Sequence, residues 1–319
     1  MKLAIILVNY NGKKYNSACI DSILQSNIQG ELLILVVDNA STDGSVELLR
    51  KQYKESDKNR IEYICLDQNY GFAAANNRGI ERAAEHGADY VLLLNNDTEI
   101  APDMLEQLEL CAARHPDSMI APKIYYSDER NRIWAAGGSV SPVIRKVSHD
   151  GLNQIDSGQF EEEKKIEFAT GCCLLLPMTI IDKAGFLDER FFLYYEDTEY
   201  SFRLRKMGIE IYYCPKAWVY HKVGGSSMGA QSPLCAYYIS RNWLVCNRQY
   251  LGARYPIFLL YYILNRSVLS LLWMIQGKPQ LVAAIWRGVS DYCKGRLGKT
   301  EYYGRLSLRI LHRNTENKS

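Results

Sequence analysis

The sequence predicts an α/β protein built on a mostly parallel, doubly wound sheet. Apolar, β-rich runs alternate with helical patterns through the N-terminal part of the chain, as in βαβ units. Each apolar run also stops abruptly at polar, turn-forming residues. Because ligands bind just outside the carboxyl ends of parallel strands, we expect these polar residues to share one edge that carries the functional site.

The elements of this sheet follow in order from the alternation. The first apolar run stops at Asn9-Tyr-Asn-Gly12, and three later runs end in the same manner. Segments with the apolar spacing of a helix separate the runs. The expected strands are 3–8, 32–37, 61–66 and 90–94, and the expected helices are 14–26, 45–55 and 72–86.

The middle of the chain is less regular. Residues 127–167 are polar and end in Glu161-Glu-Glu-Lys-Lys165, which predicts a hairpin-rich insertion with a solvated charge run. Regular patterns then return. They comprise an apolar run at 168–177, helices at 179–184 and 195–207, and a strand at 209–213.

Composition and charge restrict the possible functions. With 38 basic and 36 acidic residues the net charge is +2, so we expect no nucleic-acid partner. Nine scattered cysteines contain no C-x-x-C spacing, which favours reduced cytosolic thiols over disulfides or a zinc site. The apolar N-terminus reaches polar Asn9 too soon for a signal peptide. No nucleophile elbow and no dinucleotide fingerprint is present, which disfavours hydrolases and dehydrogenases.

The chain changes character near residue 235, so we expect a catalytic domain at 1–235 and a helical region at 236–319. Segment 256–275 is almost long enough to span a bilayer, but Asn265 and Arg266 interrupt it. An Arg at the bilayer centre costs roughly 2.5–3.5 kcal/mol on insertion scales. Nine basic and three acidic residues follow from Lys278 onward. We predict a helical region in the membrane interface, with a helical cap or a transmembrane span as alternatives.

The run Leu92-Leu-Leu-Asn-Asn-Asp97-Thr98 joins a strand to a carboxylate. A carboxylate at a strand end can hold a hard divalent cation together with substrate phosphates. The alternative is a helix cap, in which Asp97 or Thr98 satisfies free N–H groups. The motif alone does not separate the two interpretations.

Two further motifs follow earlier strands. Asp38-Asn-Ala-Ser-Thr-Asp43 offers an acceptor for a nucleobase N–H, or an N-cap. The run Asn69-Tyr-Gly-Phe-Ala-Ala-Ala-Asn-Asn-Arg-Gly79 places small residues at a strand-to-helix turn, where backbone N–H groups can approach a diphosphate. As a phosphate motif it is weak, because it matches neither a Walker sequence nor G-x-G-x-x-G.

Two candidate catalytic or ligand sites lie later in the chain. Glu196 and Asp197 are adjacent carboxylates after an aromatic run, where an apolar environment can raise a pKa and produce a usable base. They can equally be acids that favour a helix N-terminus. His221 precedes a Gly-Gly-Ser-Ser loop that could close over a ligand while the imidazole binds a metal, although a lone His is usually structural.

In their order, these motifs resemble those of inverting glycosyltransferases of family 2, which have the nucleotide-sugar-binding GT-A fold. The resemblance extends from Val8 to about Ser227. Three runs look most like bacterial rhamnosyltransferases of surface polysaccharide (O-antigen or capsule) assembly. They are Asn69-Tyr-Gly-Phe72, Phe186-Leu-Asp-Glu-Arg-Phe-Phe192 and Tyr238-Ile-Ser-Arg-Asn242.

The resemblance implies a role for individual residues. Asp38 matches the acid that contacts the donor pyrimidine, and Asp197 matches the catalytic base, with Glu196 beside it toward the acceptor. Asp97 and His221 match the ligands of a divalent cation, Mg²⁺ or Mn²⁺, but Asn95 replaces the first acid of the family's D-x-D motif. The expected donor-binding residues are Val8, Asn9, Tyr10, Asp38, Asn69, Gly71, Asn76, Asn95, Asn96, Thr170 and Gly171.

The implied function is inverting transfer of a sugar from a dTDP- or UDP-sugar to a hydroxyl of a saccharide carried on a polyprenyl diphosphate lipid. L-Rhamnose from dTDP-rhamnose is the expected donor sugar. The expected location is peripheral, on the cytoplasmic face of the inner membrane. Two alternatives stay open: a transferase for a galactofuranosyl, glucosyl or N-acetylhexosaminyl nucleotide, and a non-catalytic scaffold that binds a sugar nucleotide.

Overall fold

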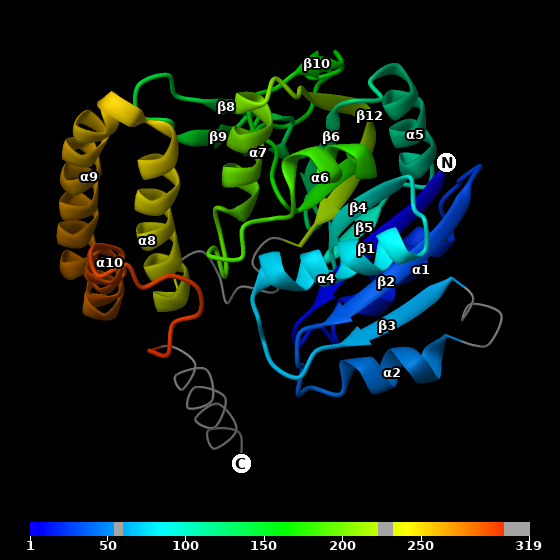
Figure 1. Cartoon of the computed structure of the whole chain (residues 1–319), viewed down its shortest axis with the longest axis horizontal. Coiled ribbons are helices and arrows are strands. Elements are labelled where there is room, and N and C mark those ends of the chain that lie inside the picture. The colour runs from blue at the N-terminus through cyan, green and yellow to red at the C-terminus, as the bar shows by residue number, and fades with distance from the viewer. Residues whose placement is uncertain (54–59, 223–231, 303–319) are drawn as a thin grey trace.

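The computed structural model describes residues 1–53, 60–222 and 232–302 (Figure 1). The strands are β1 (Lys2–Asn9), β2 (Glu31–Asp38), β3 (Ile61–Cys65), β4 (Tyr90–Asn95), β5 (Thr98–Ile100), β6 (Met119–Tyr126), β7 (Ile133–Ala135), β8 (Gly138–Val140), β9 (Val147–His149), β10 (Lys164–Lys165), β11 (Cys173–Pro177) and β12 (Ile211–His221). The helices are α1 (Asn16–Leu24), α2 (Ser45–Gln52), α4 (Phe72–Glu85), α5 (Met104–Arg114), α6 (Met178–Ala184), α7 (Glu196–Lys206), α8 (Pro233–Tyr250), η1 (Gly252–Arg254), α9 (Tyr255–Ile275) and α10 (Pro279–Cys293).

The main sheet has the order β10-β12-β6-β11-β4-β1-β2-β3. Strands β4, β1, β2 and β3 pair in parallel, as do β12 and β6, whereas β11 runs antiparallel between β4 and β6. In register, Asn9 lies opposite Asp38 and Val8 lies opposite Asn95. The predicted α/β class with a mostly parallel sheet is confirmed, and the polar strand ends do share one edge.

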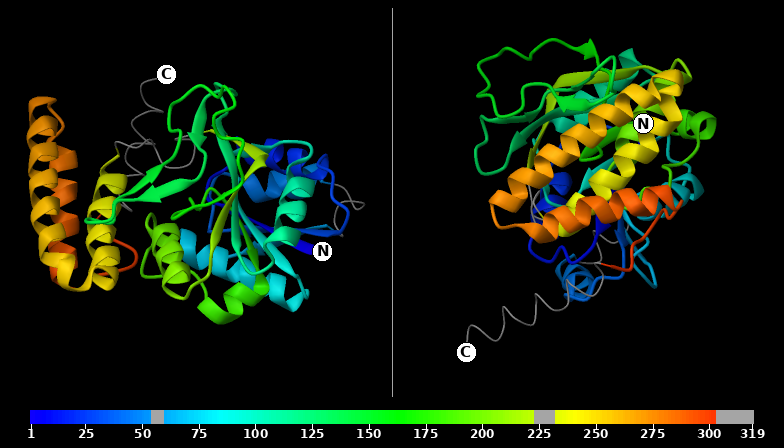
Figure 2. Two further views of the ribbon diagram at one scale, coloured as in Figure 1. Left: turned by 90° about the horizontal axis from the view of Figure 1, so that it is seen from above. Right: turned by 90° about the vertical axis from the view of Figure 1, so that its left-hand side faces the viewer.

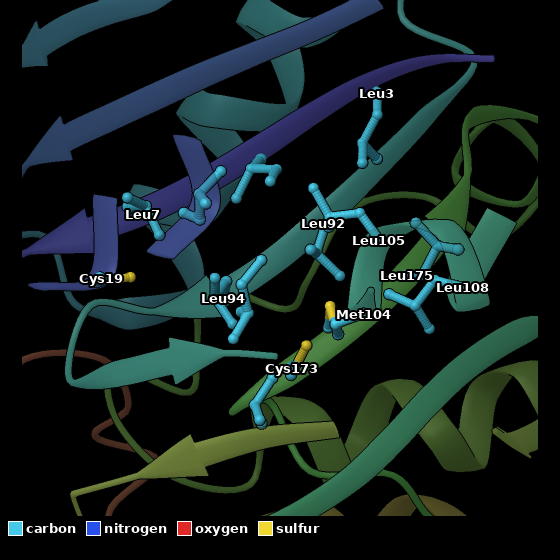
Figure 3. Close-up of a cluster of buried hydrophobic side chains, with 14 of the residues drawn as sticks. Leu3, Leu7, Cys19, Leu92, Leu94, Met104, Leu105, Leu108, Cys173 and Leu175 are labelled. Atoms are coloured by element: carbon cyan, nitrogen blue, oxygen red, sulfur yellow. The ribbon is translucent and has the colours of Figure 1, made fainter. Parts of the chain in front are cut away.

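Helices cover both faces of the sheet. One core packs α1 and α5 against the strands, and Figure 3 shows its side chains, among them Leu92, Met104 and Leu175. The opposite core packs α4, α6 and α7, with Ile80 and Leu204 fully buried. Because the central strands are covered on both faces, their sequences are continuous apolar runs rather than alternating patterns.

The sequence predictions were incomplete after β4. Helix α5 and strand β6 were missed. The expected strand at 209–213 is in fact β12, which continues to His221. Pro215 favours a strand stop, but it lies at an irregularity between Cys214 and Trp218, where the register with β6 shifts. The extension matters because it delivers His221 to the edge of the sheet.

Helices α8, α9 and α10 form a separate layer beside the sheet (Figures 1 and 2). Helix α8 lies nearest the sheet domain, and α9 lies outermost. The domain boundary expected after residue 235 falls in the first turn of α8. Tyr237, Tyr238, Leu281 and Ile285 form the buried contact between α8 and α10.

Helix α9 has one buried and one exposed face. Arg266 is on the buried face, where its guanidinium lies 4.9 Å from the ring centre of Trp243. An apolar stripe of Ile257, Leu260, Leu264, Val268, Leu271 and Ile275 is exposed, each side chain by 58–75%. Arg266 therefore does not interrupt this stripe, contrary to the expectation from the sequence. Among the described residues, only 252–275 is long and apolar enough to cross a membrane.

Candidate active site

A buried amide network holds the ends of β1, β2 and β4 together. The Asn9 amide donates to Asp38 Oδ1 at 2.7 Å and to Ser45 Oγ at 2.8 Å. Its carbonyl oxygen accepts from the backbone N–H of Gly12 and the amide of Asn16. These bonds occupy the polar atoms of the Asn9 side chain and orient Asp38.

Asn96 belongs to the same network. Its amide donates to Asn16 Oδ1 at 2.6 Å and to Asn9 Oδ1 at 3.3 Å. A Cβ at Gly12 would lie 2.3 Å from the Asn96 amide nitrogen, so only glycine fits beside it. Asn96 thereby fixes the turn after β4, with the neighbouring Asn95 half-buried and Asp97 buried.

The loop before α4 is held by a residue that the sequence analysis did not select. Asn39 donates to Asn69 Oδ1 and to the carbonyl of Gly71, both at 3.1 Å. Gly71 has φ +94°, and an added Cβ would lie 2.4 Å from the carbonyl oxygen of Phe192. The loop before α4 can therefore approach the backbone of Phe192 this closely only with glycine at position 71.

Other expected donor residues occupy different surroundings. The side chain of Tyr10 is 46% exposed just beyond β1, and Val8 is half-buried within that strand. Asn76 is buried on α4 and donates to the carbonyl of Phe72 in its own helix. Lys299 was not selected from the sequence. Its ammonium group donates to the Asn69 carbonyl at 3.0 Å, which places a positively charged side chain of the C-terminal segment beside the loop before α4.

Asp97 and His221 face each other although they are far apart in sequence. Asp97 Oδ1 lies 3.3 Å from His221 Nε2, and both residues are buried. Burial disfavours the imidazolium, but Cys172 and Asp97 outweigh it and raise the pKa of His221 to about 10. The Gly-Gly-Ser-Ser loop expected to close after His221 lies outside the described residues.

This pair fits a divalent cation. A carboxylate oxygen and an imidazole nitrogen converge in a buried position, and a cation can replace the proton that they now share. Mg²⁺ is usually bound by few protein carboxylates, and water and phosphate oxygens complete its coordination shell, so two protein ligands are sufficient. Asn95 adds no second carboxylate to the pair.

Another group of potential ligands lies at α5 and β12. Within the described ranges, Cys111, Glu163 and Cys214 are the one group of three whose ligand atoms lie within 4.8 Å of one another. Glu163 already accepts from Arg114 at 2.5 Å and from His115 at 2.7 Å. Because its charge is compensated in this way, we do not assign the catalytic cation there.

Glu196 and Asp197 begin α7 in different environments. Burial raises the pKa of Asp197, but N–H groups of Gly171 and Thr198 oppose this by donating to it at 2.8 and 2.6 Å. Burial and the charge of Asp197 raise the pKa of Glu196 well above its ordinary value. Glu196 therefore favours its neutral form more strongly than Asp197 does, since N–H groups donate to Asp197 and oppose the effect of its burial.

The turn from Thr170 to Cys172 joins the two groups. Gly171 donates to Asp197, and the carbonyl of Cys172 accepts from the backbone N–H of Asn95 at 2.9 Å. Thr170 caps this turn through a hydrogen bond of 3.4 Å from the N–H of Cys172. The start of α7 and the end of β4 are therefore connected through residues 170–172.

Helix α8 positions the segment before Asp197. Tyr194 and Tyr195 have φ of +65° and +76°, a strained conformation for non-glycine residues. Asn242, fully buried, donates to the carbonyls of Leu193 and Tyr194 at 2.9 and 2.8 Å. Asn242 lies in the Tyr238–Asn242 run that carried part of the resemblance, and that was the available signal for it.

An aromatic wall from the insertion borders the site. The Trp134 ring lies 4.5 Å from the His149 ring and 4.9 Å, edge-on, from the His221 ring. His149 in turn lies 5.7 Å from Phe168, and burial lowers its pKa to about 4, so the ring is neutral. The predicted hairpin insertion is confirmed by β8 and β9, but its irregular sequence gave no sign that it reaches the site.

Residues 4–185 match the family described as Glycosyl transferase family 2. The chain belongs to this family. The family 2 chain is 30% identical over 213 residues to the low-salt glycan biosynthesis hexosyltransferase Agl10 of Haloferax volcanii, covering 66% of this chain and 64% of that protein. It is 24% identical over 245 residues to the dTDP-rhamnosyl transferase RfbF of Shigella flexneri, covering 74% and 77%.

A third relative is the N-acetylglucosaminyl-diphospho-decaprenol L-rhamnosyltransferase of Mycobacterium tuberculosis, at 26% identity over 236 residues, 67% of this chain and 75% of that protein. Among solved structures, GalNAc-T7 with UDP, GalNAc and Mn²⁺ superimposes with a TM-score of 0.63 at 13% identity, covering 78% of this chain and 48% of that one. S. aureus TarS 1-349 with UDP-GlcNAc gives 0.56 at 17%, covering 92% and 82%. These likenesses confirm the GT-A fold of the family 2 chain.

Proposed function

We propose that this chain transfers L-rhamnose from dTDP-rhamnose to a hydroxyl of a lipid-linked saccharide during surface polysaccharide synthesis. The observation that carries the proposal is the Asp97–His221 pair beside the buried Asp197 at one edge of the sheet. A diphosphate-binding corner and a base are the two parts that direct displacement at a sugar carbon requires. The rhamnosyl choice is supported by two relatives whose names contain this sugar.

In the proposed reaction, Asp197 accepts the proton of the acceptor hydroxyl as its oxygen attacks the anomeric carbon. Hydrogen bonds from Gly171 and Thr198 favour the ionised form of Asp197 and orient its carboxylate before the substrate binds. The bond from the anomeric carbon to the nucleoside diphosphate breaks as the new bond forms. One displacement therefore inverts the anomeric centre.

Asp97 and His221 would hold the divalent cation, Mg²⁺ or Mn²⁺. When bound, such a cation stabilises the negative charge that develops on the departing diphosphate. Asp38, oriented by Asn9, would accept from the pyrimidine, and the loop from Asn69 to Gly71 would lie along the diphosphate. Trp134 and His149 would pack against a sugar ring, since aromatic walls are typical of small-molecule sites.

Two other functions make different predictions. A transferase for a UDP-linked hexose would share every feature of the site, because donor choice rests on contacts of the sugar itself. A non-catalytic scaffold would need no base, so a buried, hydrogen-bonded Asp197 argues against it. A donor screen distinguishes the rhamnosyltransferase from a transferase for a UDP-linked hexose. Replacement of Asp197 distinguishes a transferase from a non-catalytic scaffold.

Thermal shift with a panel of nucleotide sugars should identify the donor. We expect dTDP-rhamnose to stabilise the chain when Mn²⁺ or Mg²⁺ is present, by about 2.7 kcal/mol at a ligand concentration of 100 Kd. UDP-GlcNAc, UDP-glucose and UDP-galactofuranose form the comparison set, and GDP-mannose is the purine control. Stabilisation by a UDP-sugar alone would replace rhamnose as the donor, and no stabilisation by any member would contradict the proposal.

We also propose that the exposed stripe of α9 lies in the interface of the inner membrane, on its cytoplasmic face. The stripe is entirely aliphatic, and α8 separates it from the catalytic domain, so it is available to lipid while the site remains in water. The single charge of α9 is buried against Trp243, which removes the main cost of contact with lipid. An acceptor carried on a polyprenyl lipid would then be presented at the same surface.

Vesicle flotation tests this placement. The triple variant Leu260→Gln, Leu264→Gln, Leu271→Gln should lose about 4.5 kcal/mol of partitioning free energy or more, because each buried leucine contributes about 1.5 kcal/mol or more. These side chains are exposed, so the fold should persist. A matched variant replaces three exposed leucines elsewhere, Leu48, Leu110 and Leu152, with Gln. Equal flotation of the two variants would contradict membrane contact through α9.

A further inference from the structure

A basic pocket lies where α7, α8 and the loop between β8 and β9 meet. Its volume is about 380 Å³, within the range of small-molecule sites. It is lined by Arg145, Phe202, Arg205, Lys206, Gln249 and Tyr250. Three of these six residues are cationic, and none is acidic.

The pocket is separate from the catalytic site. Asp197 lies in the first turn of α7, whereas Arg205 and Lys206 lie in its last turn. At 1.5 Å rise per residue, Asp197 and these two residues are roughly 12–14 Å apart along the helix axis. None of the residues proposed for the donor, the cation or the base lines the pocket.

Arg145 is held in the pocket by its backbone and by aromatic rings. Its φ of +47° is strained for a non-glycine residue, and hydrogen bonds within the turn from Ser141 to Lys146 maintain it. Its guanidinium lies 4.3 Å from the ring centre of Phe202 and 5.8 Å from that of Tyr250. The loop between β8 and β9 therefore holds the Arg145 side chain in a fixed position in the pocket.

The positive charge of Arg145 is not neutralised by the protein. Across the described ranges it forms no ion pair, and its buried Nε has no hydrogen-bond acceptor. Burial, and then the neighbouring Arg205, hold the pKa of Arg145 below its ordinary value. Arg205 pairs with Glu167 at 2.7 Å, whereas Lys206, like Arg145, has no ion pair among the described residues. An anion in the pocket would relieve the repulsion and give Nε an acceptor.

The pocket adjoins the start of the apolar helix. Gln249 and Tyr250 end α8, and η1 and α9 follow directly. Arg254 of η1 donates to the carbonyl of Pro142 at 3.3 Å, which ties the loop that carries Arg145 to the root of α9. A phosphate held here would therefore lie near the start of α9.

We propose that Arg145, Arg205 and Lys206 form an anion site for a phosphate group, and that the group is the headgroup of an anionic lipid. Arginine and lysine are the side chains that bind phosphate most readily, and arginine does so with a planar fork of donors. The source of the phosphate rests on the proposed contact of α9 with the membrane. The anion site itself does not depend on sugar transfer.

Two adjacent residues provide a matched test. Arg145→Gln and Lys146→Gln remove the same charge from the same turn, but Lys146 does not line the pocket. Diffuse attraction to an anionic surface, roughly fivefold in partitioning per charge, would affect both variants equally. If the pocket binds the headgroup, Arg145→Gln should lose at least about five times more vesicle binding than Lys146→Gln when the vesicles contain phosphatidylglycerol. On vesicles of phosphatidylcholine alone, we expect no such difference between the two variants. Lys206→Gln should repeat the larger loss, and it keeps the test valid if Arg145→Gln unfolds.

Inorganic pyrophosphate distinguishes the sources of the anion. Millimolar pyrophosphate without divalent cations should raise the Tm of the full chain and of Lys146→Gln, but not that of Lys206→Gln. If pyrophosphate behaves so while flotation of all variants is equal, the anion site stands and its ligand is a soluble phosphate rather than a lipid. Equal flotation together with no pyrophosphate effect would overturn the site. Donor stabilisation in Lys206→Gln, measured separately, shows that a failure here leaves the proposed transferase untouched.

Discussion

Replacing Asp197 with Asn should lower the rate of sugar transfer by roughly 10²- to 10⁴-fold, the range that a general base supplies. Asn has nearly the same shape and can still accept from one of the two N–H groups that now donate to Asp197. It cannot take a proton from the acceptor hydroxyl. The fold, checked by circular dichroism, and donor stabilisation, checked by thermal shift, should persist.

The pH dependence gives the same base a second test. Transfer requires ionised Asp197, and burial raises its pKa, so kcat/KM should fall as the pH drops through that raised pKa and level off above it. The acid limb should be absent from the residual rate of Asp197→Asn. Glu196→Gln should lose far less than Asp197→Asn, because burial raises the pKa of Glu196 well above its ordinary value and favours its neutral form. Asp182→Asn, on the exposed side of α6, is the control for removal of a carboxylate. Near-normal turnover in Asp197→Asn would refute the proposed base.

Replacing Asp97 with Asn should abolish measurable Mn²⁺ binding and reduce transfer by roughly 10²–10³-fold, since a bound cation supplies several kcal/mol of charge stabilisation. Mn²⁺ binding can be followed by electron paramagnetic resonance without any substrate. Asn95→Asp provides the opposite change, because it restores a second acid to the triplet. We expect it to bind Mn²⁺ more tightly than the natural chain. Unchanged Mn²⁺ affinity in Asp97→Asn would place the cation elsewhere.

Proton release should accompany cation binding at this pair. The pKa of His221 is about 10 without a cation, so at neutral pH the imidazole is protonated and a cation must displace that proton. The apparent Kd for Mn²⁺ should therefore fall about tenfold per pH unit as the pH rises toward that pKa. The same raised pKa stabilises the cation-free fold most at low pH, and this contribution is lost as pH rises through about 10. Calorimetry in two buffers of different ionisation enthalpy measures the released proton.

Several features of the fold and site followed from local sequence. Alternating apolar and helical segments predicted the parallel sheet, because each strand run and its polar ending are contiguous in the chain. The order of Asp38, Asp97, Asp197 and His221 predicted the family. Helix α5 and strand β6 were missed, and the strand expected at 209–213 continues to His221 past Pro215, because an irregularity between Cys214 and Trp218 accommodates that proline.

The fold class, the family and the polar residues at the strand ends could be predicted from the sequence alone, because they depend on periodicity and on motif order. The tertiary structure was needed to show that Asn9 and Asn96 form hydrogen bonds inside the protein, whereas Asp97 lies opposite His221. It also distinguished Asp197, which accepts hydrogen bonds from two N–H groups, from Glu196, whose pKa burial and the charge of Asp197 raise further. The reason is physical: burial, hydrogen bonding and charge pairing are set by segments distant in the chain. The same long-range packing buries Arg266 and leaves an aliphatic stripe exposed on α9, which could not be predicted from the order of residues in the sequence.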